Sequence, residues 1–178
     1  SNVTGYAMTE IGGTMMLYGT NAEQGLWLGI RSGKTVDEKV TLPLTTVEIF
    51  QYAMANTTSE TGKYTVNWEE LTKCFALDDG AFYRSDLAGD LKLYGVNLFY
   101  LLTEALAYCP NITSVRIAAD QTYLGQFIFE EDSALKTVEF NWTTTMAAGT
   151  FTGCDSLDRI VFYSHSPIAF CIFGNSGF

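Results

Sequence analysis

The residues that could act directly in catalysis are few in this sequence. His165 is the only histidine, and it lies among turn-forming residues in "YSHSP". A Ser/His/Asp or Cys/His arrangement needs that histidine beside a nucleophile, and no nucleophile motif is present. The stretch "GIRSGKT", Gly29 to Thr35, is one residue too short between its glycines for a phosphate-binding loop, so we interpret it as a turn between strands. We predict no catalytic residue, no cofactor and no enzymatic activity.

One enzymatic alternative stays open at this point. It would place a site in the N-terminal segment around "MMLYGTNAEQGLWLG". Glu10, Glu23 and Lys34 would then have to converge in a cleft, because general acid and base groups must reach the same substrate atoms.

The cysteine and acidic residues also lack the spacing that is typical of metal ligands. No two of the four cysteines have the C-x-x-C spacing of a zinc site. The acidic stretches "LDDG" and "EEDS" lack the alternating ligands of a calcium loop, so we expect solvated turns and no metal. The cysteine and acidic residues in question are Cys74, Cys109, Cys154, Cys171, Asp78, Asp79, Glu130, Glu131 and Asp132.

Composition narrows the classes of partner. The chain has 20 acidic and 10 basic residues, a net charge of −10, and no basic patch that could bind phosphates, so we predict no nucleic-acid partner. No apolar run approaches the ~18 residues that span a bilayer, so we predict no membrane insertion. With 178 residues, 47% of them hydrophobic, the chain can form one domain with a core.

The elements that position any binding residues come from an internal repeat. "FTGCDSLDRIVF", from Phe151, aligns with "FEEDSALKTVEF", from Phe129. The first residue of each unit, termed the leading residue, recurs at intervals of 24, 23, 22 and 22 residues. A unit led by Met54 precedes these by 28 residues and carries an insertion around "TTSETGKYTVNW". The later leading residues are Phe82, Leu106, Phe129, Phe151 and Phe173.

Three further apolar columns keep this register. An apolar residue lies five positions before each leading residue, an aliphatic residue lies six positions after several of them, and an alternating apolar pair follows. The first column is Ile49, Leu77, Leu101, Leu124, Met146 and Ile168. The second is Ile112, Leu135 and Leu157. The alternating pairs are Leu91 and Leu93, Val115 and Ile117, Val138 and Phe140, and Ile160 and Phe162.

A repeat this short predicts a solenoid. One unit cannot bury its own apolar side chains, so neighbouring units must stack and share a core. The alternating pair has the period of a strand with one buried face, so stacked units form a parallel sheet along one face, which we expect to be concave. We expect residues 39–178 to form the repeat domain, with five repeats and the start of a sixth, and residues 1–38 to form a capping segment.

The same geometry limits how the cysteines can pair. Cys109 and Cys154 occupy the same slot two units apart, about 10 Å from each other for strands about 4.8 Å apart. A disulfide needs Cα atoms within about 7 Å, so these two cannot pair, and we expect both to be buried packing residues. The sequence leaves the pairing of Cys74 and Cys171 open.

The repeat resembles that of the BspA-like leucine-rich repeat proteins, whose pattern is roughly I-G-x-x-A-F-x-x-C-x-x-L-x-x-I-x-I-P. "LDDGAFY", "ALAYCPNITSVRI", "LGQFIFEEDSALKTVEF" and "TFTGCDSLDRIVF" fit it from about Val40 onward, although Asp132 stands where the family has Cys. The resemblance implies a leucine-rich repeat solenoid of a secreted or surface-displayed bacterial protein. The sequence shows no signal peptide, which we expect to have been removed.

The resemblance and the geometry together predict a binding face. If Val115 and Ile117 point inward, their neighbours point outward, and the aligned units form outward columns. Repeat proteins commonly bind partners on such a surface, so we expect a protein or glycan ligand at a cell surface. The open alternative is a structural spacer without a ligand of its own. The candidate ligand-binding residues are Lys92, Tyr94, Ser114, Arg116, Thr137, Glu139, Asn141, Arg159, Val161 and Tyr163.

Overall fold

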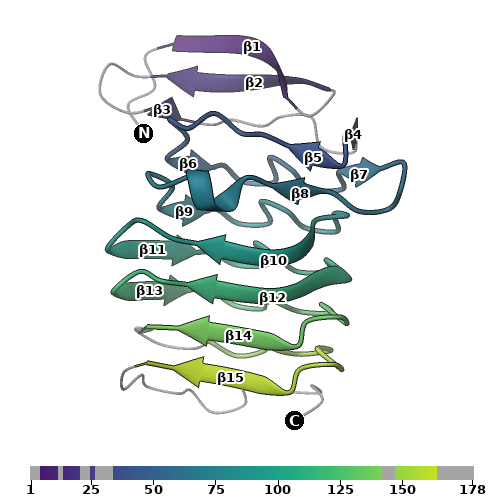
Figure 1. Ribbon diagram of the computed structural model, residues 1–178, viewed down its shortest axis with the longest axis vertical. Coiled ribbons are helices and arrows are strands. Elements are labelled where there is room, and N and C mark those ends of the chain that lie inside the picture. The colour runs from purple at the N-terminus through teal and green to yellow at the C-terminus, as the bar shows by residue number, and fades with distance from the viewer. Residues whose placement is uncertain (1–4, 12–13, 21–24, 27–33, 142–146, 164–178) are drawn as a thin grey trace.

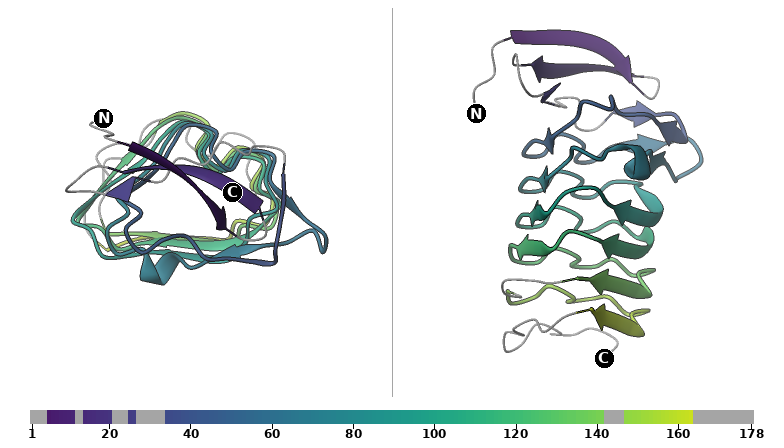
Figure 2. Two further views of the ribbon diagram at one scale, coloured as in Figure 1. Left: turned by 90° about the horizontal axis from the view of Figure 1, so that it is seen from above. Right: turned by 60° about the vertical axis from the view of Figure 1, so that its left-hand side comes forward.

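A computed structural model describes residues 5–11, 14–20, 25–26, 34–141 and 147–163. The chain forms a parallel β-solenoid of about five turns, which confirms the predicted fold class (Figure 1). Seen from above, successive turns follow nearly the same outline (Figure 2). The single helix of the described residues is the 3-10 helix η1, Trp68–Glu70.

The strands are short, as expected for units of 22 to 28 residues. Those of the N-terminal half are β1 (Gly5–Ile11), β2 (Thr14–Thr20), β3 (Gly25–Leu26), β4 (Thr35–Val36), β5 (Lys39–Val40), β6 (Glu48–Ile49), β7 (Thr58–Ser59), β8 (Thr65–Val66) and β9 (Ala76–Leu77). Those that follow are β10 (Ala88–Leu93), β11 (Leu98–Leu101), β12 (Asn111–Ile117), β13 (Gln121–Leu124), β14 (Thr137–Phe140) and β15 (Arg159–Phe162).

The first sheet is parallel, with the strand order β10-β12-β14-β15. It is the sheet that the alternating apolar pairs predict. Leu91 pairs with Val115, Val115 with Val138, and Val138 with Ile160, so the register matches the repeat. Inward residues of β10, β12 and β14 are buried, whereas Ile160 and Phe162 of β15 are partly buried against the same core.

A second parallel sheet, with the order β13-β11-β9-β6, forms the adjacent wall of the solenoid. It contains the column that lies five residues before each leading residue, and Ile49, Leu77, Leu101 and Leu124 are all buried there. The sequence identified this column as apolar, but two-residue strands such as β6 and β9 are too short to show an alternation.

The leading residues lie in a turn that connects the second sheet to the first. Met54, Phe82, Leu106, Phe129 and Phe151 are all fully buried, as predicted. In each unit the residues two before and two after the leading residue are left-handed, with φ between 54° and 74°. These residues are Tyr52, Gly80, Glu104, Phe127 and Gly149, and Asn56, Arg84, Tyr108, Glu131 and Gly153.

The left-handed turns bond each unit to the next. In the unit of Phe82, the N–H groups of Gly80, Phe82 and Arg84 donate to carbonyl oxygens of the following unit at 2.9, 2.9 and 3.0 Å. The units of Met54, Leu106 and Phe129 repeat these three bonds. The turns therefore form a third hydrogen-bonded ladder beside the two sheets, which satisfies backbone groups that would otherwise be buried without partners.

The insertion of the Met54 unit forms β7, β8, η1 and the loop between β7 and β8. This loop is held in place, because Ser59 N–H donates to Asp86 Oδ2 at 3.0 Å and Asn111 Nδ2 donates to the Gly62 carbonyl at 2.8 Å. The insertion then places η1 beside β10, at the N-terminal edge of the first sheet (Figure 1).

An antiparallel sheet, β1-β2-β3, lies at the N-terminal end of the stack (Figures 1 and 2). Part of the predicted capping segment, residues 1–38, lies outside the described residues, so its boundary stays a prediction. So do the unit led by Phe173 and the positions of Met146, Ile168, His165 and Cys171, which also lie outside.

A buried column of small polar residues runs inside the turns, three positions after each leading residue. It consists of Thr57, Ser85, Cys109, Asp132 and Cys154. The expectation that Asp132 lies in a solvated turn is wrong, because its side chain is fully buried. Its repeat position places it inside the stack, where Oδ1 accepts the Cys109 N–H at 2.8 Å and Oδ2 has no partner.

The cysteines of this column are free thiols, which confirms that Cys109 and Cys154 do not pair. Each donates to the carbonyl of the preceding leading residue, Cys109 Sγ to Phe82 at 3.1 Å and Cys154 Sγ to Phe129 at 3.0 Å. Cys74 is also a buried free thiol, and burial raises its pKa to about 12.

We therefore expect these three thiols to resist alkylation in the folded protein, because the thiolate is the nucleophile and burial disfavours it. Iodoacetamide at mildly alkaline pH, followed by peptide mass spectrometry, should leave Cys74, Cys109 and Cys154 unmodified in native protein and alkylate all three in denaturant. Native labelling of any of them as fast as in denaturant would contradict their buried positions.

Candidate functional site

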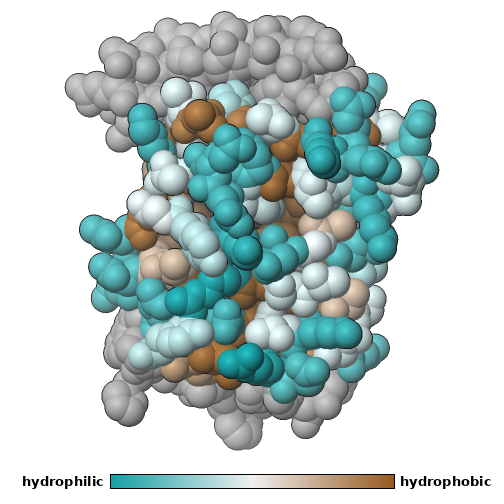
Figure 3. All heavy atoms as spheres, in the orientation of Figure 1, coloured by the Kyte–Doolittle hydropathy of each residue, from teal (hydrophilic) through white to brown (hydrophobic). Residues whose placement is uncertain are grey.

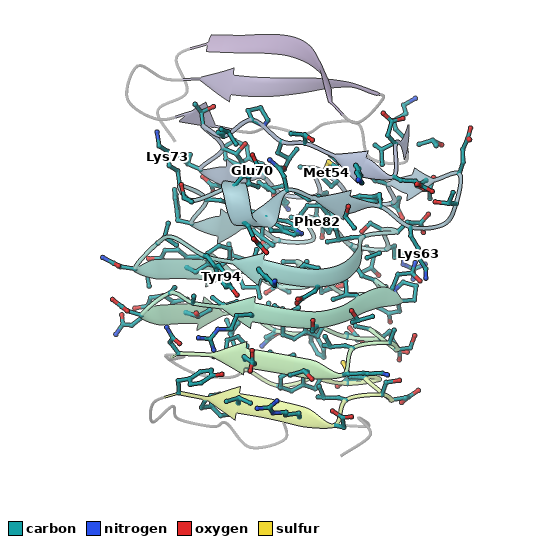
Figure 4. The ribbon with its side chains drawn as sticks, viewed as in Figure 1. Met54, Lys63, Glu70, Lys73, Phe82 and Tyr94 are labelled. Atoms are coloured by element: carbon teal, nitrogen blue, oxygen red, sulfur yellow. The ribbon has the colours of Figure 1, made fainter. Side chains whose placement is uncertain are left out.

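The outward face of the first sheet carries the ten predicted binding residues, and its aligned columns have the predicted register. Lys92 pairs with Arg116, Arg116 with Glu139, and Glu139 with Val161. Asp90, Ser114, Thr137 and Arg159 form the neighbouring column in the same way. Tyr94, Asn141 and Tyr163 directly follow β10, β14 and β15, and Figure 4 shows Tyr94 at the end of its strand.

Arg116 is the centre of a cluster that spans three strands. Its Cζ lies 4.1 Å from the centroid of the Tyr163 ring, and its Nη2 donates to Asn141 Oδ1 at 2.9 Å. Asn141 in turn donates to the Ala118 carbonyl at 2.7 Å, and the Tyr163 hydroxyl donates to Glu139 Oε1 at 3.1 Å. The two part-buried hydrogen bonds fix Arg116 and Asn141 relative to the sheet without a ligand, whereas the contacts of Tyr163 are exposed to solvent.

The N-terminal part of the face has a second polar cluster, around Lys92. Lys92 Nζ lies 3.2 Å from Glu69 Oε1 of η1 and 3.9 Å from Asp90 Oδ2, while Ser114 donates to Asp90. A cleft of about 270 Å³ lies between η1 and β10, lined by η1 residues together with Asp90 and Lys92. Figure 4 shows Glu70 on η1, in front of the strands.

Seen from the front, the face is mainly polar, with hydrophobic side chains visible between the polar ones (Figure 3). Its exposed aromatic residues are Tyr94, 36% exposed, and Tyr163, 57% exposed. Tyrosine and arginine are the residue types that most often contribute binding energy at protein interfaces. The face therefore combines such residues with a hydrogen-bonded parallel sheet.

Two features beside these columns escaped sequence reasoning. The helix η1 lies in an insertion that no other unit shares, so the repeat contains no signal for it. The second is an aromatic column on the second sheet, where the rings of Tyr100 and Tyr123 stack at 5.1 Å and Phe75 contacts Tyr100 edge-on. Its signal was available, because Tyr100 and Tyr123 each directly precede a residue of a predicted apolar column. The faces of the stacked Tyr100 and Tyr123 rings contact each other, so we interpret this column as a packing feature.

The described residues contain no group of three or more His, Cys, Asp or Glu side chains that could hold a metal ion. Asp78 and Glu48 form one hydrogen-bonded pair of carboxyl groups. Burial and this hydrogen bond raise the pKa of Asp78 to about 7. The convergence of Glu10, Glu23 and Lys34 involves residues outside the described part or without described side chains, so that alternative is untested.

In the part of the chain that the structure describes, no helix has both the length and the apolar character needed to cross a membrane.

Comparison with known proteins identifies the repeat. The BspA type leucine rich repeat region, in six copies, matches residues 70–177, which is more than half of the chain and includes every strand of the first sheet. No curated protein and no solved structure matches the chain. The solenoid, its register and this match agree: the chain belongs to the BspA-type leucine-rich repeat family.

Proposed function

We propose that the protein is a non-enzymatic binding module, secreted or displayed at a cell surface, whose outward face of the first sheet binds a protein or glycan. Membership of the family supports this, because BspA-type repeats are typically parts of surface or secreted proteins that often bind partners. The observation that carries the proposal is the Arg116 cluster. It brings together an arginine, a tyrosine and two further polar groups from three strands, with the arginine held by a part-buried hydrogen bond to Asn141.

A fixed cluster favours binding because fewer side-chain rotamers must be frozen when a partner arrives. Ordering a flexible side chain at an interface costs about 0.5 to 1.5 kcal/mol. Arg116 and Asn141 are already ordered by their hydrogen bonds to each other and to the Ala118 carbonyl, so part of that cost is met on folding.

The test is a charge reversal with a matched control. Arg116→Glu should weaken binding by tenfold or more on a glycan array and on a panel of purified extracellular proteins, because it puts a carboxylate beside Glu139. Arg84→Glu is the control, since Arg84 also lies over tyrosine rings, those of Tyr83 and Tyr108, but on the turn side. Circular dichroism should show that both variants are folded.

Equal binding by wild type and Arg116→Glu would refute the assigned face. A wild type that binds nothing on either panel would instead support the spacer.

A further inference from the structure

The guanidinium of Arg116 has an unmet capacity for hydrogen bonding. A guanidinium carries five N–H groups. Nη2 is used by Asn141, but Nη1 is buried and has no hydrogen-bond partner. A buried donor without an acceptor is unfavourable, and it becomes favourable when an acceptor reaches it. A carboxylate suits this position, because its two oxygens accept two parallel N–H bonds from the planar fork of an arginine.

The cover over this guanidinium is weakly held. The Tyr163 ring lies over Cζ, and Tyr163 is 57% exposed. Its one hydrogen bond to another side chain, to Glu139, is also exposed to solvent, where competition with water weakens it. A rotation of the Tyr163 side chain would therefore open Arg116 without disturbing the strands, whose inward residues form the core.

The pattern of charges around Arg116 indicates the kind of ligand. The face carries charges of both signs, Asp90 and Glu139 together with Lys92, Arg116 and Arg159, while the whole chain carries a net charge of −10. A uniformly acidic polymer would meet like charges at Asp90 and Glu139 and the repulsion of the whole chain. A protein surface of mixed sign can place an acidic side chain on Arg116 and basic ones near Asp90 and Glu139.

We infer that Arg116 receives the carboxylate of an Asp or Glu side chain of a protein ligand, and that the Tyr163 ring is a movable cover over this receptor. This inference rests on the proposed function and specifies the chemistry of the same face. Lys92 and Arg159 flank the receptor, but Lys92 is already paired with Glu69 and Asp90, so it is less available to an incoming carboxylate.

The experiment follows the side-chain ¹⁵N–¹H signals of the arginines by NMR while a probe is added at constant ionic strength. The probe is the blocked pentapeptide acetyl-Lys-Gly-Asp-Gly-Lys-amide, with its Asn counterpart and sodium glucuronate as comparison compounds. The Asp peptide should shift the Arg116 signal in a saturable way and leave that of Arg84 unchanged. The Asn peptide should have no effect, and glucuronate should bind more weakly.

Two variants give opposite expected results. Arg116→Lys keeps the charge but loses the fork, so the affinity for the Asp peptide should fall about tenfold. Tyr163→Ala removes the cover, so the affinity should rise about 2- to 5-fold, the amount expected when an exposed cation–π contact no longer competes. Arg84→Lys should change neither value.

Several outcomes would overturn the inference. It fails if the Arg116 signal does not respond, if the Asn peptide acts equally, if Tyr163→Ala weakens binding, or if glucuronate binds more tightly than the Asp peptide. If Arg116→Glu also abolishes binding of a larger ligand, such a failure removes the carboxylate receptor and leaves the proposed face intact.

Discussion

Asp132→Asn should stabilise the protein at neutral and alkaline pH and have little effect in mild acid. Asp132 is fully buried, and burial raises its pKa well above the ordinary value. An unfolded aspartate releases its proton near pH ~3.9, so the folded state holds more protons above that pH. Stability therefore falls as pH rises toward the folded-state pKa, by about 1.4 kcal/mol per pH unit from this group.

Asparagine keeps an oxygen that can accept the Cys109 N–H, and it has no proton to lose. The difference in free energy of unfolding between variant and wild type should thus grow with pH, by about 1.4 kcal/mol per pH unit until the folded-state pKa of Asp132 is reached. Urea denaturation at a series of pH values measures it. Asp155→Asn changes an exposed carboxylate one unit further on and should follow the wild-type curve. Parallel curves for Asp132→Asn and wild type would show that Asp132 is not kept protonated by folding.

Gly95→Ala should be among the most destabilising single-methyl substitutions in the chain. Gly95 has φ +99°, and a Cβ there would lie 2.8 Å from both Cα and the carbonyl oxygen of Thr72. The connection between β10 and β11 would have to move away from backbone, which cannot rotate aside as a side chain can. We expect a loss of about 2 to 5 kcal/mol, from backbone strain of about 1 to 2 kcal/mol together with overpacking of about 1 to 3 kcal/mol.

Gly62→Ala is the matched control for this substitution. Gly62 also has a positive φ, +81°, but a Cβ there meets nothing within 4 Å. It should lose only the strain contribution, about 1 to 2 kcal/mol. Urea denaturation of both variants separates the two effects. Equal losses of unfolding free energy for Gly95→Ala and Gly62→Ala would show that the contact with Thr72 does not destabilise the Gly95→Ala variant.

The repeat predicted the stacking and the outward columns because both follow from spacing alone. Once Val115, Val138 and Ile160 are assigned to one inward column, alternation fixes Arg116, Glu139 and Val161 as outward neighbours. The contact between Arg116 and Tyr163 could not be predicted in this way. It depends on side-chain rotamers, which the period of a repeat does not determine.

The left-handed turns could not be predicted from the sequence, for a different reason. Residues such as Tyr52, Glu104 and Phe127 rarely adopt positive φ, so propensity argues against the conformation that they have. Among these positions, Gly80, Gly149, Gly153 and Asn56 are of residue types that favour this conformation. The inter-unit hydrogen bonds outweigh the local preference in the units led by Met54, Leu106 and Phe129. The sequence did not predict the burial of Asp132 either, because its neighbours Glu130 and Glu131 suggested a solvent-facing acidic turn.

The three hydrogen-bonded ladders also determine how the protein would respond to mechanical force. In both sheets and in the turns, the bonds between units run along the axis of the stack. Tension applied between β1 and β15 therefore loads the bonds of one interface at a time, as in unzipping, and not all together, as in shear (Figure 1). Such a domain extends stepwise, by one unit of 22 to 28 residues at each step, and its neighbours stay folded.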